Sequence, residues 1–421
     1  MILNKYAGLL LGGIVAGCMM LMLIHPGGSL DAALRGLAVW WDVLFPSLFP
    51  FFVISEMLLG FGIVHLFGAL LDPLMRPLFN IPGSGGFVAA MGYVSGYPVG
   101  AKLTAKLREQ NMISRVEGER LVAFTTSSDP IFLLGAVSVG FFHDASLGLV
   151  LALAHYGGGL IVGLLMAFHG RSESAAAGAG SGSPAASVHP SPAQGQRYGR
   201  MRTALHAMAE ARRSDGRTLG ELLKSAVASS LQLIIVVGGL VVFFNVLMEL
   251  LARAGIMSAL FSASGRLLSL AGFPQELSAA LVSGLFEVTL GARSAGEAAG
   301  GIPLQFKAAA AAFILSWGGL SVHAQVASIL NGTGLRYLPF MLARLVHALL
   351  ATGLLLLLWK PVTGSSLSAA WIALPASYGL AAPQGAWIGS LRLFGLLLVF
   401  LLLLSGLVLA LSSLRRLLVR R

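Results

Sequence analysis

A polar motif occurs twice in an otherwise apolar sequence. The first copy runs from Ser95-Gly96 to Gly100-Ala101-Lys102, and the second runs from Ser283-Gly284 to Gly291-Ala292-Arg293. In each copy a further polar cluster follows, at 125–130 and at 316–321, with a serine 33 residues after the first serine of the motif. A repeated pair of segments interrupted by Gly, Pro and Ser in an apolar chain is typical of the binding site of a membrane transporter.

The first copy has the residues of a tight turn at membrane depth. Glycine permits the turn and proline removes a backbone donor, so the segment 95–98 is predicted to unwind and to leave N–H groups free. Helices that start from such a turn direct their positive ends at an anionic group. The alternative is a plain interrupted helix in which glycine serves close packing. The candidate substrate-binding residues of this copy are Ser95, Gly96, Tyr97, Pro98 and Lys102.

The clusters at 125–130 and 316–321 are each predicted to break a helix, through Pro130 or through Gly318-Gly319. Broken helices offer unwound carbonyls and hydroxyls to a substrate or a coupling ion. The alternative is that the Ser and Thr side chains bond back to their own helix. The candidate binding residues here are Ser127, Ser128, Ser316, Trp317 and Ser321.

Asp129 stands beside Pro130 in the first of these clusters. A carboxylate in an unwound intramembrane segment indicates coupling to protons or sodium ions. Capping of the helix after Pro130 would explain the residue equally well.

The second copy and a later span carry the other intramembrane charges. Burying a charge costs about 2.5 to 3.5 kcal/mol on insertion scales, so charges kept at this depth need a use. Arg293 and Arg344 could neutralise an anionic substrate, and Glu287 could act as a coupling or gating carboxylate. Alternatively, Glu287 forms a structural ion pair with an arginine inside the protein, or it lies at the membrane–water interface. The candidate binding residues of this part are Ser283, Gly284, Phe286, Arg293 and Arg344.

Two histidines lie near these groups. His155, inside an apolar span, is expected to form an interhelical hydrogen bond rather than a proton relay. His347 follows Arg344 by one helical turn.

Composition makes this chain a polytopic membrane protein. It is 56% hydrophobic and 11% charged, with a mean hydropathy of +0.84, which a soluble domain could not carry on its surface. The net charge of +11 comes from cations clustered in short loops, as the positive-inside rule expects, so nucleic-acid binding is not predicted. The single cysteine, Cys18, excludes an intrachain disulfide and a Cys-based metal site. No metal site, cofactor or enzymatic constellation is predicted.

Eight spans of about 20 apolar residues each can be assigned, at 6–24, 38–62, 121–142, 147–168, 226–250, 308–332, 337–359 and 390–413. The cation-rich segments 102–120 and 171–224 and the C-terminal tail are assigned to the cytoplasm. The first span is interpreted as an uncleaved helix rather than a signal peptide, because its apolar run continues past Cys18.

All the cation-rich segments can be cytoplasmic only if each motif segment enters and leaves the membrane on the same side. The segments 84–102 and 276–293 are therefore predicted to be re-entrant hairpins. The prediction is therefore an all-α protein with an inverted repeat of span, hairpin, span, span. The predicted regions are a first helix with an external loop (1–37), repeat 1 (38–170), a flexible basic cytoplasmic linker (171–225), repeat 2 (226–360), and an external loop, last helix and basic tail (361–421). The linker is predicted to contain a surface helix at 201–213. Its charge would suit anionic lipid, although a solvated linker without a specific partner is the simpler interpretation.

The motifs resemble those of the YlbJ family of sporulation integral membrane proteins, also called stage V sporulation protein V. The resemblance covers about 38–359 and includes Gly92 to Lys102, Ser128 to Phe132, Gly284 to Gly291 and Ser316 to His323. That family belongs with the nucleoside-recognition Gate-domain proteins, whose relatives include the concentrative nucleoside transporters.

The resemblance implies movement of dipicolinic acid, a small organic dianion, from the mother cell through the outer forespore membrane. Lys102, Arg293 or Arg344 could then supply positive charge to the substrate. Tyr97, Phe286 and Trp317 could supply an apolar or aromatic wall. A nucleoside or other organic-anion carrier, or a sporulation scaffold that recruits partners through its basic linker, are the alternatives. The coupling ion and the oligomeric state are left open.

Overall fold

The computed structural model describes residues 2–170 and 200–364, and this part of the chain contains helices and no strand. Repeat 1 and the segment before it form α1 (Ile2–Ile24), α2 (Pro26–Ala38), the π-helix η1 (Val39–Leu44), α3 (Phe45–Gly60), α4 (Ile63–Phe79), α5 (Ser84–Ser95), α6 (Tyr97–Glu109), α7 (Arg115–Thr125), the π-helix η2 (Ile131–Phe141) and α8 (Leu147–Met166). The second half forms α10 (Arg200–Asp215), α11 (Leu219–Arg253), α12 (Ile256–Leu270), the 3₁₀ turn η3 (Gln275–Leu277), α13 (Ser278–Phe286), α14 (Val288–Gly296), α15 (Leu304–Trp317), α16 (Gly319–Leu330) and α17 (Tyr337–Thr363).

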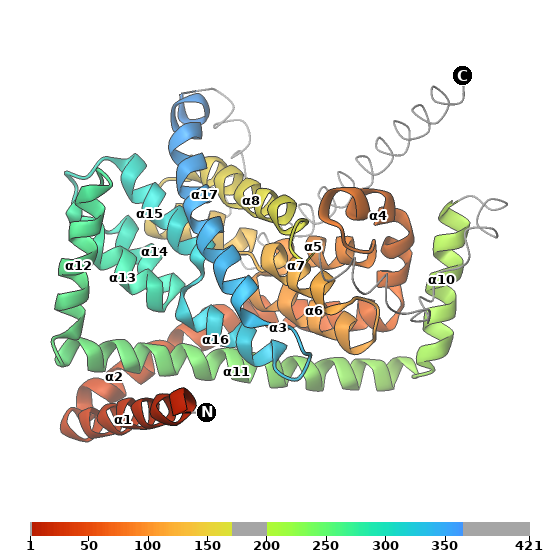
Figure 1. The fold of residues 1–421 in the computed structure, drawn as a ribbon, viewed down its shortest axis with the longest axis horizontal. Helices are drawn as coiled ribbons and strands as arrows, with labels where there is room; N and C mark the ends of the chain where they lie inside the picture. The colour runs from red at the N-terminus through yellow and green to blue at the C-terminus, as the bar shows by residue number, and fades with distance from the viewer. Residues whose placement is uncertain (1, 171–199, 365–421) are drawn as a thin grey trace.

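The long helix α11 runs along one edge of the molecule, and α10 and α12 rise from its two ends (Figure 1). It is 35 residues long and begins at a capping box, in which Thr218 and Glu221 bond to each other's backbone N–H. The hairpins and broken helices lie between α10 and α12, with α17 crossing them (Figure 1).

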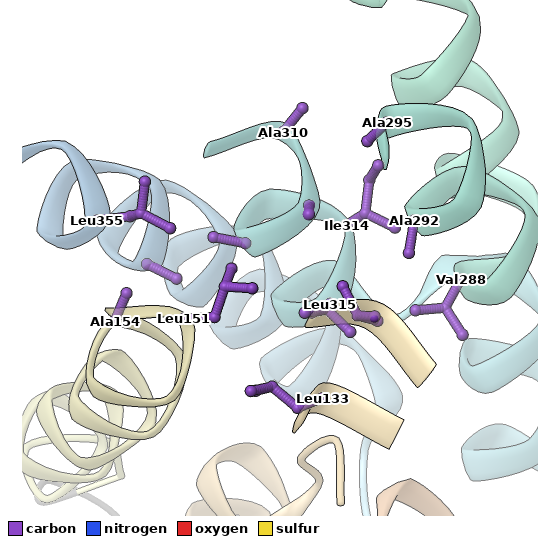
Figure 2. Close-up of a cluster of buried hydrophobic side chains, with 14 of the residues drawn as sticks. Leu133, Leu151, Ala154, Val288, Ala292, Ala295, Ala310, Ile314, Leu315 and Leu355 are labelled. Carbon is purple, nitrogen blue, oxygen red and sulfur yellow. The ribbon is translucent and has the colours of Figure 1, made fainter. Parts of the chain in front are cut away.

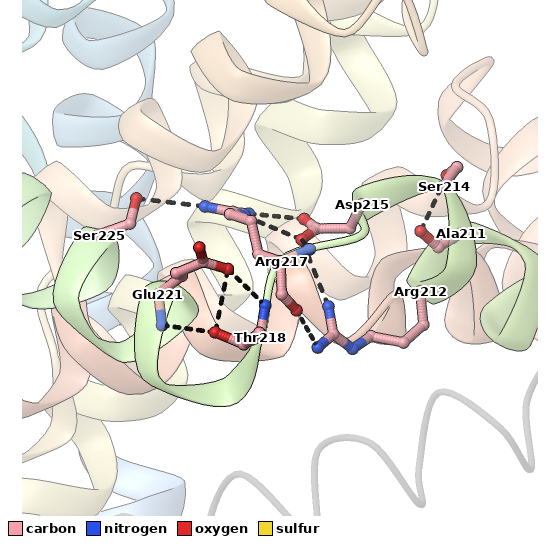
Figure 3. A network of polar contacts seen from close by, with 8 residues as sticks. All are labelled: Ala211, Arg212, Ser214, Asp215, Arg217, Thr218, Glu221 and Ser225. Carbon is pink, nitrogen blue, oxygen red and sulfur yellow. Dashed lines mark hydrogen bonds and ion pairs between the residues drawn. The ribbon is translucent and has the colours of Figure 1, made fainter.

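The elbow between α10 and α11 is held by a network of polar contacts (Figure 3). Arg217 donates to both carboxylate oxygens of Asp215, at 2.8 and 2.6 Å, and to Ser225 Oγ at 3.2 Å. Arg212 donates to the carbonyl of Arg217 at 2.6 Å. The bonds from Arg217 hold the pKa of Asp215 below its ordinary value. The helix predicted at 201–213 is thus present as α10, and it has a defined orientation to α11 and packs on α4.

Four helical segments are long and apolar enough to cross a membrane: Leu147–Met166, Leu219–Arg253, Leu304–Leu330 and Tyr337–Thr363. They match the predicted spans 147–168, 226–250, 308–332 and 337–359. Two bent pairs, Val15–Ile24 with Pro26–Asp42 and Phe52–Gly60 with Ile63–Phe79, would raise the number to six. The predicted span 390–413 lies outside the described residues, so the total of eight stays a prediction.

Three predicted spans are not single straight helices, and one of them, 308–332, is divided into α15 and α16 at Gly318. The segment 38–62 begins in η1, continues as α3, and meets α4 at a bend of 83° after the left-handed Gly62. The segment 121–142 is divided into α7 and η2 by an unwound stretch. The helices α2, α4 and α12 were not predicted. The helix α2 lies where an external loop was expected within 1–37, α4 contains Pro73 and Pro77, and α12 has four serines among its apolar residues.

Both motif segments fold as helical hairpins. In the first, α5 and α6 pack against each other on either side of Gly96, and in the second α13 and α14 pack on either side of Glu287. The legs cross at glycines, because a Cβ on Gly291 would lie 2.2 Å from Gly284 Cα and one on Gly92 3.3 Å from Gly100 Cα. Helix pairs without side chains at the crossing can approach this closely.

The largest apolar cluster joins α8, α14, α15 and α17 (Figure 2). Ala308 to Ala312 of α15 are all buried, so small side chains let the neighbouring helices pack close to this helix. The cluster shown includes Leu151, Ala154, Val288, Ala292, Ile314, Leu315 and Leu355.

The ends of four helices meet at one buried ionic node. Glu119, whose side chain has no exposed surface, accepts two hydrogen bonds from the Arg336 guanidinium, at 2.8 and 2.9 Å, and contacts His169 Nε2 at 2.7 Å. The neighbouring Arg120 donates to the carbonyls of Asn80 and His169 at 2.7 and 3.0 Å. All these residues fall in segments predicted to face the cytoplasm.

The contacts of Glu119 in this node predict how the stability of the protein depends on pH. Burial alone would raise the pKa of Glu119, but the bonds from Arg336 and His169 outweigh it and lower the pKa from 4.5 to about 2. A depressed carboxyl pKa stabilises the fold above the unfolded value and loses that contribution as the pH falls from about 4.5 to about 2. Glu119→Gln should therefore cost about 2 kcal/mol at pH 7, after a discount for the half-exposed Arg336.

Thermal unfolding of the purified protein and of the Glu119→Gln variant, at pH 7 and at pH 3, checks this expectation. The difference between the two melting temperatures should shrink at pH 3. A difference that is equal at both pH values would contradict the assignment of the charge to Glu119.

Candidate functional site

The tip of the first hairpin has the predicted turn. Gly96 adopts φ +89° and ψ −178°, a backbone conformation open only to glycine, and α6 starts at Tyr97 without a side-chain cap. The Tyr97 hydroxyl donates to the carbonyl of Leu315 in the other repeat at 2.7 Å. Ser95 Oγ is buried and has no hydrogen-bond partner in the described part of the chain. The tip therefore contacts α15, and it keeps a polar group that has no partner among the described residues.

The first broken span unwinds between α7 and η2. Thr125 and Thr126 bond back to the carbonyls of Leu121 and Val122 at 2.8 Å, as the simpler alternative expected. Ser127 and Ser128 behave differently, because they face α8. Ser127 Oγ lies 2.8 Å from His155 Nε2, and the backbone N–H of Ser128 donates to the same nitrogen at 3.1 Å.

Asp129 and Glu287 have the same structural role. Asp129 Oδ1 accepts from the backbone N–H of Phe132 at 2.8 Å, and Glu287 Oε2 accepts from that of Leu290 at 2.8 Å. Each carboxylate thus caps the N-terminus of the helix that follows a break, η2 or α14. Capping was the stated alternative for Asp129. The Glu287 side chain is buried and bonded to its own helix, and no ion pair between it and an arginine is seen among residues 2–170 and 200–364.

The second broken span turns at two glycines. Gly318 and Gly319 have φ of +90° and +74°, and a Cβ on Gly319 would lie 3.0 Å from the carbonyl oxygen of Phe286. The tip of the second hairpin thus lies directly against the start of α16. Trp317 Nε1 donates to the carbonyl of Leu285 at 3.3 Å, and Ser321 is buried nearby in α16. Ser316 Oγ lies 2.8 Å from His155 Nδ1.

The two copies of the motif differ in register. Sequence alignment places Ser283-Gly284 opposite Ser95-Gly96, but the break of the second hairpin is at Glu287, one turn later. Gly284 instead packs against Gly291, as Gly92 packs against Gly100. The three additional residues of the second copy therefore put a carboxylate where the first copy has its glycine turn.

Arg344 lies next to the points where the first helix of each broken span, α7 or α15, ends. Its guanidinium is fully buried and donates to the carbonyl of Thr126 at 2.6 Å and to that of Leu315 at 3.3 Å. It also bonds to His347 Nδ1 at 2.9 Å and lies over the Tyr97 ring, 5.9 Å from its centre. No carboxylate of residues 2–170 or 200–364 forms an ion pair with it. The negative ends of α7 and α15 partly balance the charge, which suits a cation at helix C-termini.

The cations that end the two motifs are not at this site. Lys102 forms a nearly buried ion pair with Glu56 of α3 at 3.1 Å. Arg293 is 59% exposed and pairs with Glu297 one turn further along α14 at 2.8 Å. Of the three candidate cations, the structure brings only Arg344 to the point where the breaks meet.

Three residues were missing from the predicted set of binding residues: His155 and Tyr156 of α8, and His347 of α17. His155 and Tyr156 of α8 contact the first break, with the Tyr156 hydroxyl donating to the Ser128 carbonyl at 3.2 Å. His347 donates to the His155 carbonyl at 2.7 Å, and its ring lies 4.9 Å from the His155 ring. The expectation of an interhelical bond at His155 is confirmed. A histidine in each of two neighbouring apolar helices was the signal available in the sequence.

Comparison with known proteins supports a family assignment. Residues 42–173 match the family model Gate, described as nucleoside recognition. The chain is 47% identical over 338 residues to the sporulation integral membrane protein YlbJ of Bacillus subtilis (strain 168), an alignment that covers 80% of this chain and 79% of that protein. The chain belongs to the YlbJ family. Its members are integral membrane proteins by name, in agreement with the apolar helices described above. The matched Gate region includes the first hairpin, the first break and His155.

Proposed function

We propose that this YlbJ-family protein is a carrier that moves an organic dianion, dipicolinate, from the mother-cell cytosol through the outer forespore membrane. The observation that carries the proposal is Arg344, a buried cation without a carboxylate partner in the described residues, at the junction of both broken spans. A buried charge at membrane depth is costly and is typical of a substrate or ion pathway. An anionic substrate would balance it, whereas a neutral one would not.

The surroundings of Arg344 suit a flat aromatic dianion. The helices α6 and α16 both begin at a glycine without a side-chain cap, and a Cβ on Gly318 would lie 3.7 Å from Tyr97 Cε1. Two uncapped helix N-termini close together provide backbone N–H groups for carboxylates. Tyr97, Phe286 and Trp317 provide apolar surface next to them.

We further propose that the two hairpins enter from opposite sides and that the halves form an inverted repeat around this site. The node of Glu119, Arg336 and His169 supports a shared cytoplasmic side for these ends. The C-terminal ends of two other helices, η2 and α14, also lie together, because Gly296 packs against the carbonyl of Phe141; this contact supports a shared external side. Movement of the hairpins would then expose the site alternately to each side.

Coupling is proposed to occur at the two capping carboxylates, Asp129 and Glu287. Protonation of either carboxylate, or sodium binding to it, would weaken its hydrogen bond to the helix that it caps. The unwound segment next to Arg344 would then become more mobile. Transport by Asp129→Asn and Glu287→Gln variants at several pH values and sodium concentrations tests this. Ion dependence that is unchanged in both variants would exclude them as coupling groups.

A nucleoside carrier is the second candidate, because the Gate model that matches 42–173 is described as nucleoside recognition. The two candidates separate in one experiment with the full-length protein in liposomes. Uptake of labelled dipicolinate is measured alone and in the presence of excess unlabelled dipicolinate or excess nucleoside. We expect saturable dipicolinate uptake that nucleosides leave unchanged. Absence of dipicolinate uptake together with saturable nucleoside uptake would contradict the proposal.

A further inference from the structure

His155 contacts the first unwound segment and the last turn of α15, the helix before the second break. Its Nε2 atom lies 2.8 Å from Ser127 Oγ and 3.1 Å from the backbone nitrogen of Ser128, both in the first break. Its Nδ1 atom lies 2.8 Å from Ser316 Oγ, at the end of the helix before the second break. The side chain has no exposed surface. One imidazole ring thus bridges residues 188 positions apart in the chain, Ser128 and Ser316.

The partners fix the protonation state of this ring. A backbone N–H can only donate, so Nε2 must accept the bond from Ser128 and carries no proton. The proton of the neutral ring is then on Nδ1, which donates to Ser316 Oγ. Ser127 Oγ also donates to Nε2. A second proton, on Nε2, would point at the Ser128 N–H and break the contact with the first break.

The same reasoning applies to His347. The Arg344 guanidinium can only donate, so His347 Nδ1 accepts its bond and the proton is on Nε2. That proton is donated to the His155 carbonyl at 2.7 Å. Gly158 and Gly159 of α8 allow this approach, because a Cβ on Gly158 would lie 3.1 Å from His347 Cδ2. The His155 backbone is thereby fixed by α17, while its side chain contacts the first break and the last turn of α15.

We infer that His155 is a positioning residue that holds the two unwound segments in register, acting as the neutral Nδ1–H tautomer. It works through Ser127, Ser128 and Ser316. Loss of the ring would let the two broken spans move relative to each other, with Arg344 still bonded to the carbonyls of both. The inference builds on the proposed function only where transport is used as a readout.

The test uses the different reach of two amides. Asparagine places its amide where Nδ1 of histidine lies, and glutamine places its amide where Nε2 lies. His155→Asn should therefore keep the contact with Ser316 and lose that with Ser127, and His155→Gln should do the opposite. Each lost buried hydrogen bond should change the half-saturation of transport by about tenfold.

Double-mutant cycles read out the two contacts separately. In the His155→Asn background, Ser127→Ala should cost nothing further and Ser316→Ala should cost about tenfold. In the His155→Gln background the two serine substitutions should exchange these effects. A ring that merely fills space would give equal effects of both serine substitutions in both backgrounds, and that result would overturn the inference.

A second measurement does not depend on transport. Cys18 is the single cysteine, so Cys18→Ser gives a background for spin labels at Val139→Cys in η2 and Leu320→Cys in α16, both at exposed positions. The distribution of label distances should be narrow with His155 and broader in His155→Ala, while Asn and Gln give intermediate widths. An unchanged width in His155→Ala would refute the positioning role. If the protein moves no dipicolinate but the label distances broaden as expected, the proposed substrate is wrong and the positioning role of His155 is still supported.

Discussion

Replacement of Arg344 by methionine should reduce dipicolinate uptake in liposomes by about a hundredfold or more. The change removes the buried positive charge and the guanidinium donor to the Thr126 carbonyl, whereas the Leu315 carbonyl keeps its bond from the Tyr97 hydroxyl. Losing one partner of a buried charged contact is worth about 3 to 5 kcal/mol, which corresponds to several factors of ten. Arg344→Lys should retain part of the activity, because it keeps the charge but cannot reach both carbonyls in the fixed fork geometry of arginine.

The matched control is Arg293→Met, since Arg293 is exposed and bonds to Glu297 away from the breaks. Uptake by this variant should stay within about twofold of the unmodified protein. Melting temperature and monodispersity in detergent separate loss of the site from loss of the fold. If uptake by Arg293→Met were impaired as much as uptake by Arg344→Met, both arginines would be needed for transport. The assignment of the substrate-binding charge to Arg344 alone would then be wrong.

A methyl group at Gly291 should disrupt the second hairpin. Its Cβ would lie 2.2 Å from Gly284 Cα, a backbone atom that cannot move without separating α13 from α14. Overpacking of this kind costs about 3 kcal/mol or more. We expect Gly291→Ala to lower the melting temperature by several degrees and to abolish uptake, and Gly100→Ala to do the same through the carbonyl of Thr125, 2.4 Å from the added atom.

Gly353→Ala is the control, because it lies in α17 and, in the part of the chain that the structure describes, no atom beyond its neighbours on that helix lies within 4 Å of the added carbon. It should leave both the melting temperature and uptake unchanged. Equal melting temperatures for Gly291→Ala and Gly353→Ala would show that the hairpin legs do not pack at Gly284.

The positions of the hairpin and helix breaks were predictable from residue type. Gly96 with Pro98, the Ser-Ser-Asp-Pro stretch at 127–130 and Gly318-Gly319 all interrupt helices where the sequence indicated. These residues act through the local backbone, which glycine permits and proline forces. The second hairpin was less predictable. Its break falls at Glu287, which is neither Gly nor Pro and whose backbone is extended as the N-cap of α14.

The partners of the charges were not predictable in the same way. Arg293 pairs with Glu297 one helical turn away, a contact that a helix makes by itself, whereas only tertiary packing directs Lys102 to Glu56 and Arg344 to carbonyls. His155 was expected to bond between helices, but its contact with Ser316 depends on the approach of α8 to α15. Helix faces show amphipathic periodicity in a sequence, whereas a contact between residues in different repeats does not.

An organic dianion is proposed to bind beside Arg344, where the two broken spans meet. Equilibrium binding of labelled dipicolinate to the purified protein, to Arg344→Met and to Arg293→Met tests this proposal most directly. We expect saturable binding to the unmodified protein and to Arg293→Met, with none detectable in a folded Arg344→Met variant. Equal binding by Arg344→Met and the unmodified protein would contradict it.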